Sequence, residues 1–248
     1  MTGKPAMDPA TTNPAKEPPQ LRPRDLQIVY EDPDLVVINK PTGYAVHKGW
    51  DQGAPLLPLV RGRVRRRLYP VHRLDRPTSG VLLFTKSSEA AALVQRAFRY
   101  RHIDKRYWAI VRGVPPEVGY IDHAIPRVKD GPRVHAQSSF VTLYHRDRYA
   151  LVEVKPTTGR LHQVRRHLKH ISHPIIGDVR YGKGDHNRHW RQVYQLHRLA
   201  LHAVRLTLPH PRTSRPLELY APLPKDFADA CVQFGVPDAI LDAVQLPA

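Results

Sequence analysis

Residues 72–80 read His-Arg-Leu-Asp-Arg-Pro-Thr-Ser-Gly and lead directly into the apolar run Val-Leu-Leu-Phe at 81–84. The stretch places one carboxylate, Asp75, between Arg73 and Arg76, beside a Pro-Thr-Ser-Gly turn. An opposite charge within a few ångströms favours the ionised form of a carboxyl group. An aspartate that stays ionised is a poor general acid but a usable nucleophile or anionic anchor. The simplest alternative is a surface salt bridge beside a turn, but the full nonapeptide is more specific than that interpretation requires.

The composition is strongly basic. The 248 residues include 39 Lys+Arg and 22 Asp+Glu, which gives a formal net charge of +17. Such an excess points to a polyanionic partner, most commonly a phosphate backbone, although a merely soluble basic protein would share it. No long apolar run, signal peptide or basic amphipathic anchor is found, so we expect no membrane association and a cytoplasmic location. The single cysteine, Cys231, predicts neither an internal disulfide nor a zinc site.

The chain divides into a tail and one domain. Residues 1–24 are rich in Pro, Thr and Lys without apolar periodicity, which predicts a disordered tail. Residues 25–248 are long enough for a single large catalytic domain. Short β-branched apolar runs predict strands at 26–29, 35–38, 81–84, 107–111, 140–144 and 149–154, the last two joined by a hairpin turn at 145–148. Strands in such numbers with few helices indicate an α+β fold with a mostly antiparallel sheet.

Two helices are expected from apolar residues at helical spacing, and a closing helix is expected after Pro224. The first is capped by Ser87 or Ser88, and its apolar face consists of Leu93, Val94, Ala97 and Phe98. The second opens near Gly159, and its apolar face consists of Leu161, Val164, Leu168 and Ile171. Arg165 lies at the edge of that face, so its guanidinium is expected to be partly buried and to need an anion. Asp75 is the candidate partner; an arginine that snorkels to solvent is the alternative.

Two clusters of polar residues invite a binding role. The densest run of charge lies just upstream of Asp75 and consists of Arg61, Arg63, Arg65, Arg66 and Arg67. Such a run usually forms a solvated face, but beside a candidate catalytic loop we interpret it, together with Arg166, as a rim that contacts phosphates. The second cluster consists of His162, His167, His170 and His173. These histidines do not share one helix face and no carboxylate or cysteine completes a site, so no metal is predicted.

Four motifs together closely resemble the RluA-type pseudouridine synthases, which isomerise uridine in structured RNA. The first is the nonapeptide at 72–80. The others are Lys-Pro-Thr-Thr-Gly-Arg-Leu-His-Gln-Val-Arg-Arg-His at 155–167, Asn-Lys-Pro-Thr-Gly at 39–43 and His-Pro-Ile-Ile-Gly-Asp at 173–178, in the family's order. The resemblance runs from Leu26 to Leu223. It implies a pseudouridine synthase fold, with a central mixed sheet, flanking helices and loops, and a basic active-site cleft.

The resemblance also implies roles for individual residues. Asp75 is expected to be the catalytic aspartate, and Arg165 is expected to pair with it. Tyr107 is expected to stack on the target uracil, with Lys105 close to phosphate. Arg73 is expected to fill the space left by the flipped base. The other residues expected at the substrate are His72, as a support for the loop, Arg160, His162 and Gln163.

The implied function is that of an RNA pseudouridine synthase without cofactor or metal, because the isomerisation involves no redox change and no net hydrolysis. Arg-Pro after His-Arg-Leu-Asp and the Gly-Asp-His-Asn-Arg-His stretch at 184–189 most resemble the branch acting on uridine 65 of tRNA. Large-subunit ribosomal RNA, or both RNAs, is the runner-up substrate. A glycoside or nucleoside hydrolase would need a second carboxylate with a raised pKa, which the motif around Asp75 does not supply. A non-catalytic RNA-binding protein explains the charge but not an aspartate in a basic groove.

Overall fold

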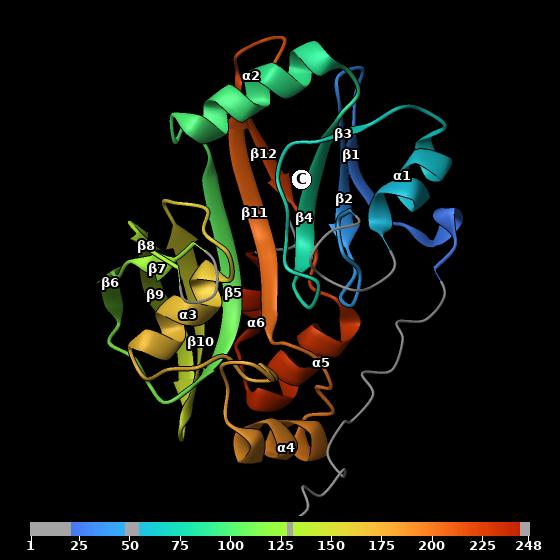
Figure 1. The fold of residues 1–248 in the computed structure, drawn as a ribbon. Coiled ribbons are helices and arrows are strands. Elements are labelled where there is room, and N and C mark those ends of the chain that lie inside the picture. Colours follow the sequence, from blue (N-terminus) through green and yellow to red (C-terminus); the bar gives the residue numbers. More distant parts are fainter. Residues whose placement is uncertain (1–20, 48–54, 128–130, 244–248) are drawn as a thin grey trace, which may run out of the picture.

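The computed structural model describes residues 21–47, 55–127 and 131–243, and they form one large sheet flanked by helices (Figure 1). The spatial order of its strands is β1-β2-β4-β11-β5-β10-β9-β6, with β12 paired to β11 and β3 to β4. The strands are β1 (Ile28–Glu31), β2 (Leu35–Lys40), β3 (Tyr69–Pro70), β4 (Ser79–Thr85), β5 (Asp104–Arg112), β6 (Val118–Asp122), β9 (Gln137–Arg146), β10 (Tyr149–Pro156), β11 (Leu201–Pro209) and β12 (Pro216–Tyr220). A separate two-stranded sheet pairs β7 (Ile125–Pro126) with β8 (Arg133–Val134).

The helices lie at the ends and sides of this sheet. They are η1 (Pro23–Asp25), α1 (Leu56–Val64), α2 (Ser88–Arg99), α3 (Gln163–His170), α4 (Gly184–Val193), α5 (Lys225–Phe234) and α6 (Asp238–Asp242). In Figure 1, α2 crosses one end of the sheet, α4 and α5 lie at the opposite end, and α1 lies beside β1 and β2. The expected α+β class is confirmed, since every pair of described strands is antiparallel except β4 with β11.

A glycine permits the parallel contact between β4 and β11. Gly80 has a φ of +116°, and a Cβ built on it would lie 2.2 Å from the carbonyl oxygen of Ala203. Only glycine combines this backbone conformation with so close an approach. The Thr-Ser-Gly that ends the nonapeptide therefore fixes how β4, and the loop that precedes it, sit against β11.

Helix α2 begins as the sequence predicts. The Ser87 hydroxyl accepts a hydrogen bond from the Ala90 amide at 3.1 Å and caps the helix. The buried face consists of Ala90, Ala91, Val94 and Ala97. Leu93 was expected on this face, but it is 38% exposed. At about 100° per residue it lies about 90° from the centre of the buried stripe, so it falls at the edge.

Helix α3 begins later than its apolar pattern predicts. Its first residue is Gln163, and the preceding His162 has a φ of 55°, outside the helical region. Leu161 therefore precedes the helix and is 42% exposed, so its expected packing on the core is wrong. The rest of the predicted stripe is confirmed, because Val164 and Leu168 are buried and Ile171 packs partly against the same cluster.

Segments near both ends of the described chain pack onto the domain. Residues 1–20 of the predicted tail lie outside the described residues, but Pro23–Asp25 form a 3₁₀ turn and the Leu21 amide donates to the Tyr44 hydroxyl at 3.1 Å. The expected closing helix after Pro224 is confirmed as α5, which buries Phe227, Ala230, Cys231 and Phe234. In the described residues, no helix is both long enough and apolar enough to cross a membrane.

Candidate active site

A pocket of about 1010 Å³ lies where the loop before β4 meets the end of α2, the start of β5 and the segment that leads into α3. Among the residues that the structure describes, one carboxylate lines it, that of Asp75. In the same part of the chain nine cationic side chains also line it: Arg73, Arg99, Arg101, Lys105, Arg127, Arg160, Arg165, Arg166 and Arg180. Such a lining attracts anions, and it surrounds a single negative charge with positive ones.

The Asp75 carboxylate is held by a buried arginine. Arg165 is only 5% exposed, and its Nη1 donates to Asp75 Oδ2 at 3.3 Å. Its Nε and Nη2 donate to the two oxygens of Asp178 at 2.8 and 2.9 Å. Burial alone would lower the pKa of Arg165, but these bonds to Asp178, with the charges of Asp178 and Asp75, raise it. The guanidinium stays charged and presents one nitrogen to Asp75.

Backbone contacts fix the loop that carries Asp75. The fully buried Lys40 donates from Nζ to the carbonyl oxygens of Arg76 at 3.1 Å and Thr78 at 2.8 Å. The Gly43 amide donates to the Arg76 carbonyl at 2.9 Å, and the Thr78 amide closes a turn onto the Asp75 carbonyl at 3.0 Å. The motif at 39–43 thus holds the backbone of the motif at 72–80 in place.

His72 supports the same loop from its other end. Its Nε2 accepts a hydrogen bond from the Leu83 amide of β4 at 2.9 Å, and its ring stacks on Phe98 of α2. Burial, with the nearby charge of Lys105, lowers the pKa of His72 to about 3. The ring is therefore neutral at physiological pH, with its remaining proton on Nδ1. These contacts match the expected supporting role.

Two residues of β5 face the pocket. Lys105 donates from Nζ to the Thr158 carbonyl at 2.8 Å, and burial, offset in part by Asp104, lowers its pKa to about 8. Tyr107, two residues on, lies on the same face of the strand. Burial and the Asp75 charge raise the pKa of the Tyr107 hydroxyl, so it stays protonated. An aromatic ring, a cation and the Asp75 carboxylate thus share one wall.

The segment before α3 is braced by an amide. Gln163 is buried; its Oε1 accepts from the Thr158 hydroxyl at 2.7 Å and the Arg160 amide at 3.0 Å. Its Nε2 donates to the Gln137 carbonyl at 2.8 Å. Arg160 donates from Nε to the His135 carbonyl at 3.1 Å. Gln163 lines the pocket, but its amide is occupied in shaping the loop, so direct contact with substrate stays a prediction for both side chains.

His162, which immediately precedes α3, also lies close to the Asp75 carboxylate. Its Nε2 is 4.0 Å from Asp75 Oδ2, and its Nδ1 is 3.0 Å from the Tyr181 hydroxyl. Arg166 donates from Nε to that hydroxyl at 3.0 Å and from Nη1 to the Pro126 carbonyl at 3.1 Å. Burial lowers the pKa of His162, and the neighbouring arginines add to this, against the opposing charge of Asp75. Tyr181 lies three residues beyond the motif at 173–178, so no sequence motif pointed to it.

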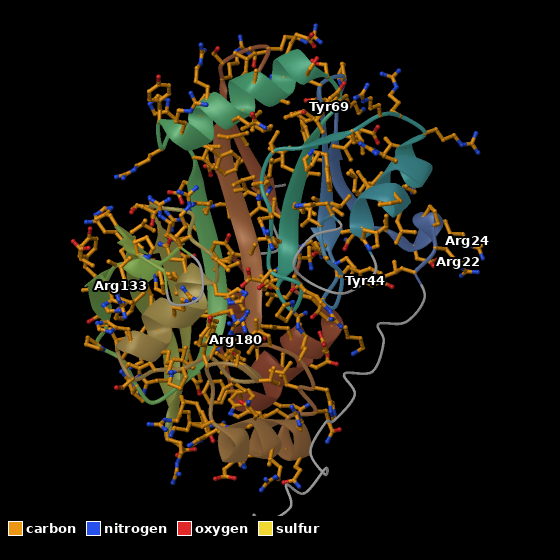
Figure 2. The ribbon with its side chains drawn as sticks, viewed as in Figure 1. Arg22, Arg24, Tyr44, Tyr69, Arg133 and Arg180 are labelled. Carbon is orange, nitrogen blue, oxygen red and sulfur yellow. The ribbon has the colours of Figure 1, made fainter. Side chains whose placement is uncertain are left out.

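The arginine run at 61–67 lies away from this pocket, since none of its side chains lines it. It belongs to α1 and the turn that follows; Arg61 donates to the Leu68 carbonyl at 2.9 Å, and Arg67 lies over the Tyr69 ring. Nearness to Asp75 along the chain therefore does not bring these side chains into the pocket lining. Figure 2 shows Arg180, which does line it, near the centre of the drawn face. Contact of the run with RNA stays a prediction.

The arrangement does not suit glycoside hydrolysis. Hydrolases of that kind use one carboxyl group kept protonated as the acid. Asp178 is the second carboxylate near Asp75, but although burial would raise its pKa, the bonds from Arg165 and from the Tyr181 and Arg180 amides lower it. In the described part of the chain, the one cluster with metal-like spacing is Asp32, Asp34 and His210, none of which lines the pocket.

Comparison with known proteins agrees with this geometry. A family model described as RNA pseudouridylate synthase matches residues 34–170. The tRNA pseudouridine synthase C of Salmonella typhimurium is 40% identical over 234 residues, which cover 85% of this chain and 90% of the relative. That of Vibrio cholerae is 37% identical over 240 residues, with 87% and 98% covered. The solved structure titled Human RNA Pseudouridylate Synthase Domain Containing 4 is 31% identical with a TM-score of 0.69, covering 84% of this chain and 92% of that one.

The chain therefore belongs to the RNA pseudouridylate synthase family, and it is an isomerase. Within that family it is an RluA-type enzyme. The solved structure titled Human RNA Pseudouridylate Synthase Domain Containing 1 matches at a TM-score of 0.73 and 26% identity, over 92% of this chain and 98% of that one.

Proposed function

We propose that this chain isomerises uridine 65 of tRNA to pseudouridine, with Asp75 as its catalytic carboxylate. The observation that carries the proposal is the Asp75 carboxylate, bound by the buried Arg165 at 3.3 Å inside a pocket that nine described Lys and Arg side chains also line. The tRNA assignment is supported by relatives named tRNA pseudouridine synthase C that are 37–40% identical over most of the chain. Large-subunit ribosomal RNA is the alternative substrate.

The chemistry requires one bond to break and one to form at ribose C1′. The bond from C1′ to uracil N1 breaks, the base turns, and C1′ joins C5; a proton leaves C5 and N1 gains one. Asp75 supplies the anion at the ribose, whether as a nucleophile or as a base. Arg165 pairs with that anion and orients it, because its other nitrogens are fixed by Asp178.

The pocket must also hold the loosened base and replace it in the RNA. Tyr107 offers its ring for stacking on the uracil, with a protonated hydroxyl near the reacting atoms. Lys105 and Arg160 would meet the flanking phosphates. Arg73, exposed at the pocket lining, would occupy the space that the flipped nucleotide leaves. A cytoplasmic location stays a prediction.

Asp75→Asn tests the catalytic assignment. Purified variant and wild-type protein would be incubated with a tRNA transcript, and pseudouridine would be mapped at each position by chemical modification and primer extension. We expect wild type to modify position 65, and Asp75→Asn to bind the transcript without forming any product. Asp34→Asn is the matched control, because Asp34 also pairs with an arginine, Arg212, but lies outside the pocket.

The same mapping separates the alternatives. RNA extracted from a strain that lacks the gene would be offered to the protein. Modification of ribosomal RNA instead of tRNA would replace the proposed substrate but leave the proposed isomerisation unchanged. Release of free uracil would indicate a hydrolase. An Asp75→Asn protein that retained full activity would remove Asp75 from the reaction.

A further inference from the structure

Tyr181 contacts Arg165 itself and three of its polar neighbours, Asp178, Arg166 and His162. Its backbone amide donates to Asp178 Oδ1 at 3.0 Å, and its ring lies 5.1 Å from the Arg165 guanidinium carbon. Its hydroxyl lies 3.0 Å from both Arg166 Nε and His162 Nδ1. One side chain thus links α3, the segment before it and the loop that carries Asp178.

The direction of these hydrogen bonds follows from their donors. Arg166 Nε can only donate, so it fills one acceptor position of the Tyr181 hydroxyl. Among the described residues no other acceptor bonds that hydroxyl, which leaves His162 Nδ1 to receive its proton. A neutral imidazole that accepts at Nδ1 carries its own proton on Nε2. That N–H lies 4.0 Å from Asp75 Oδ2, the oxygen that Arg165 also contacts.

We propose that Tyr181 is a positioning residue whose hydroxyl fixes the His162 tautomer that presents Nε2–H to the Asp75 carboxylate. The proposal rests on the function proposed above, since it assumes that Asp75 reacts. The opposite tautomer would turn a lone pair of His162 towards the carboxylate and repel it. With the Nε2–H tautomer, Asp75 Oδ2 faces two N–H groups, that of Arg165 at 3.3 Å and that of His162 at 4.0 Å.

The same contact controls when His162 takes up a second proton. The groups that face His162 are Asp75 from the catalytic loop, Arg165 and Arg166 from α3, and Arg180 with Tyr181 from the loop after Asp178. A hydroxyl that donates to Nδ1 stabilises the neutral ring, because the protonated ring has no lone pair there to accept it. Without the hydroxyl, the His162 pKa rises, and a cationic imidazole then pairs with Asp75 at a higher pH than in the wild type.

Tyr181→Phe tests the proposal, because it keeps the ring beside Arg165 and removes only the hydroxyl. We expect a fall in kcat of about five- to tenfold, the worth of one hydrogen bond, with KM unchanged. The acidic limb of the kcat–pH profile is expected to move up by about half a unit to one unit. The matched control is Tyr149→Phe, which removes a tyrosine hydroxyl that lies 3.0 Å from Nδ1 of His186, outside the pocket. That variant should leave both kcat and the profile at wild-type values.

A double variant separates positioning from loss of folding. Tyr181→Phe/His162→Gln should lose no more kcat than His162→Gln alone, because the two residues act through one contact. Additive losses, or an unshifted acidic limb in Tyr181→Phe, would overturn the proposal. Wild-type protein that forms no pseudouridine would instead contradict the function proposed above. Thermal unfolding of each variant shows whether a loss of kcat comes from a loss of native protein.

Discussion

Asp178 binds Arg165 with both carboxylate oxygens, at 2.8 and 2.9 Å, and so leaves a single guanidinium nitrogen for Asp75. Asn187 of helix α4 fixes the loop that carries Asp178. Asn187 Oδ1 accepts from the Gly177 amide at 2.7 Å, and its Nδ2 donates to the Asp178 carbonyl at 3.2 Å. The order Asn187, Asp178, Arg165, Asp75 explains how a helix at the end of the sheet can fix the Asp75 carboxylate.

Asp178→Asn should therefore cost both stability and activity. The amide keeps the size of the side chain but leaves the buried Arg165 with Asp75, at 3.3 Å, as its remaining carboxylate, and breaking a buried pair typically costs about 3 to 5 kcal/mol. Urea unfolding measures the loss, and kcat on a tRNA transcript should fall because Arg165 no longer has a fixed orientation. Asp34→Asn breaks a similar bidentate pair with the exposed Arg212 and should cost about 1 kcal/mol or less. Equal losses of unfolding free energy in the two variants would contradict this chain of contacts from Asn187 to Asp75.

Local patterns predicted the parts of this site that depend on neighbours in sequence. The Ser87 cap of α2 follows from residues within one turn, and the burial of Arg165 follows from the apolar stripe of α3. The role of Asp178 could not be predicted in this way. Its motif was recognised, but the loop that brings it under Arg165 has no periodicity from which its path could be read.

The arginine run at 61–67 shows that nearness in sequence does not give a place in the pocket lining. It precedes Asp75 by a few residues, yet none of its side chains lines the pocket, and its contact with RNA stays a prediction. In the structure, Leu56 and Val60 anchor α1 in the cluster beneath β2, beside η1, and the connection through β3 separates it from the pocket. Among the described residues, the cations that line the pocket come from five separate segments, at 73, 99–105, 127, 160–166 and 180, and only the tertiary fold brings them together.

A charge-reversal comparison measures which arginines meet RNA. Arg99 and Arg101 line the pocket at the end of α2, and both are exposed. Arg99→Glu/Arg101→Glu should weaken transcript binding and reduce the slope of log K against log salt by about two, one for each lost phosphate contact. Arg63→Glu/Arg66→Glu, on α1 and the turn after it, should change the slope less. A larger change of slope in the second pair would show that the phosphate contacts lie on α1 and the turn after it.

The close approach at Gly80 predicts a stability effect. Gly80→Ala places a Cβ 2.2 Å from the Ala203 carbonyl and forces an L residue into a φ of +116°. We expect a loss of about 2 to 3 kcal/mol in the free energy of unfolding. Gly184→Ala is the control, since nothing lies within 4 Å of a Cβ there and the residue begins α4. It should be neutral or stabilise by up to about 1 kcal/mol.

A buried histidine behind β4 makes stability depend on pH. His202 of β11 lies 2.6 Å from the Ser79 hydroxyl through Nδ1 and 3.1 Å from the Ala221 carbonyl through Nε2, so the ring is neutral. Burial lowers its pKa to about 3. A histidine with a lowered folded pKa binds a proton only in the unfolded chain between the two pKa values, so stability falls as pH drops below about 6.5.

The expected slope is about 1.4 kcal/mol per pH unit for this one group. Other histidines with lowered pKa values, among them His72, add in the same direction, so the wild-type slope alone does not isolate His202. Urea unfolding of wild type and His202→Asn between pH 6 and 5, where most carboxylates stay ionised, gives the difference. The variant should be less stable at pH 7 but show a shallower slope by about one proton. Parallel slopes would mean that His202 is protonated in the folded protein as readily as in the unfolded chain.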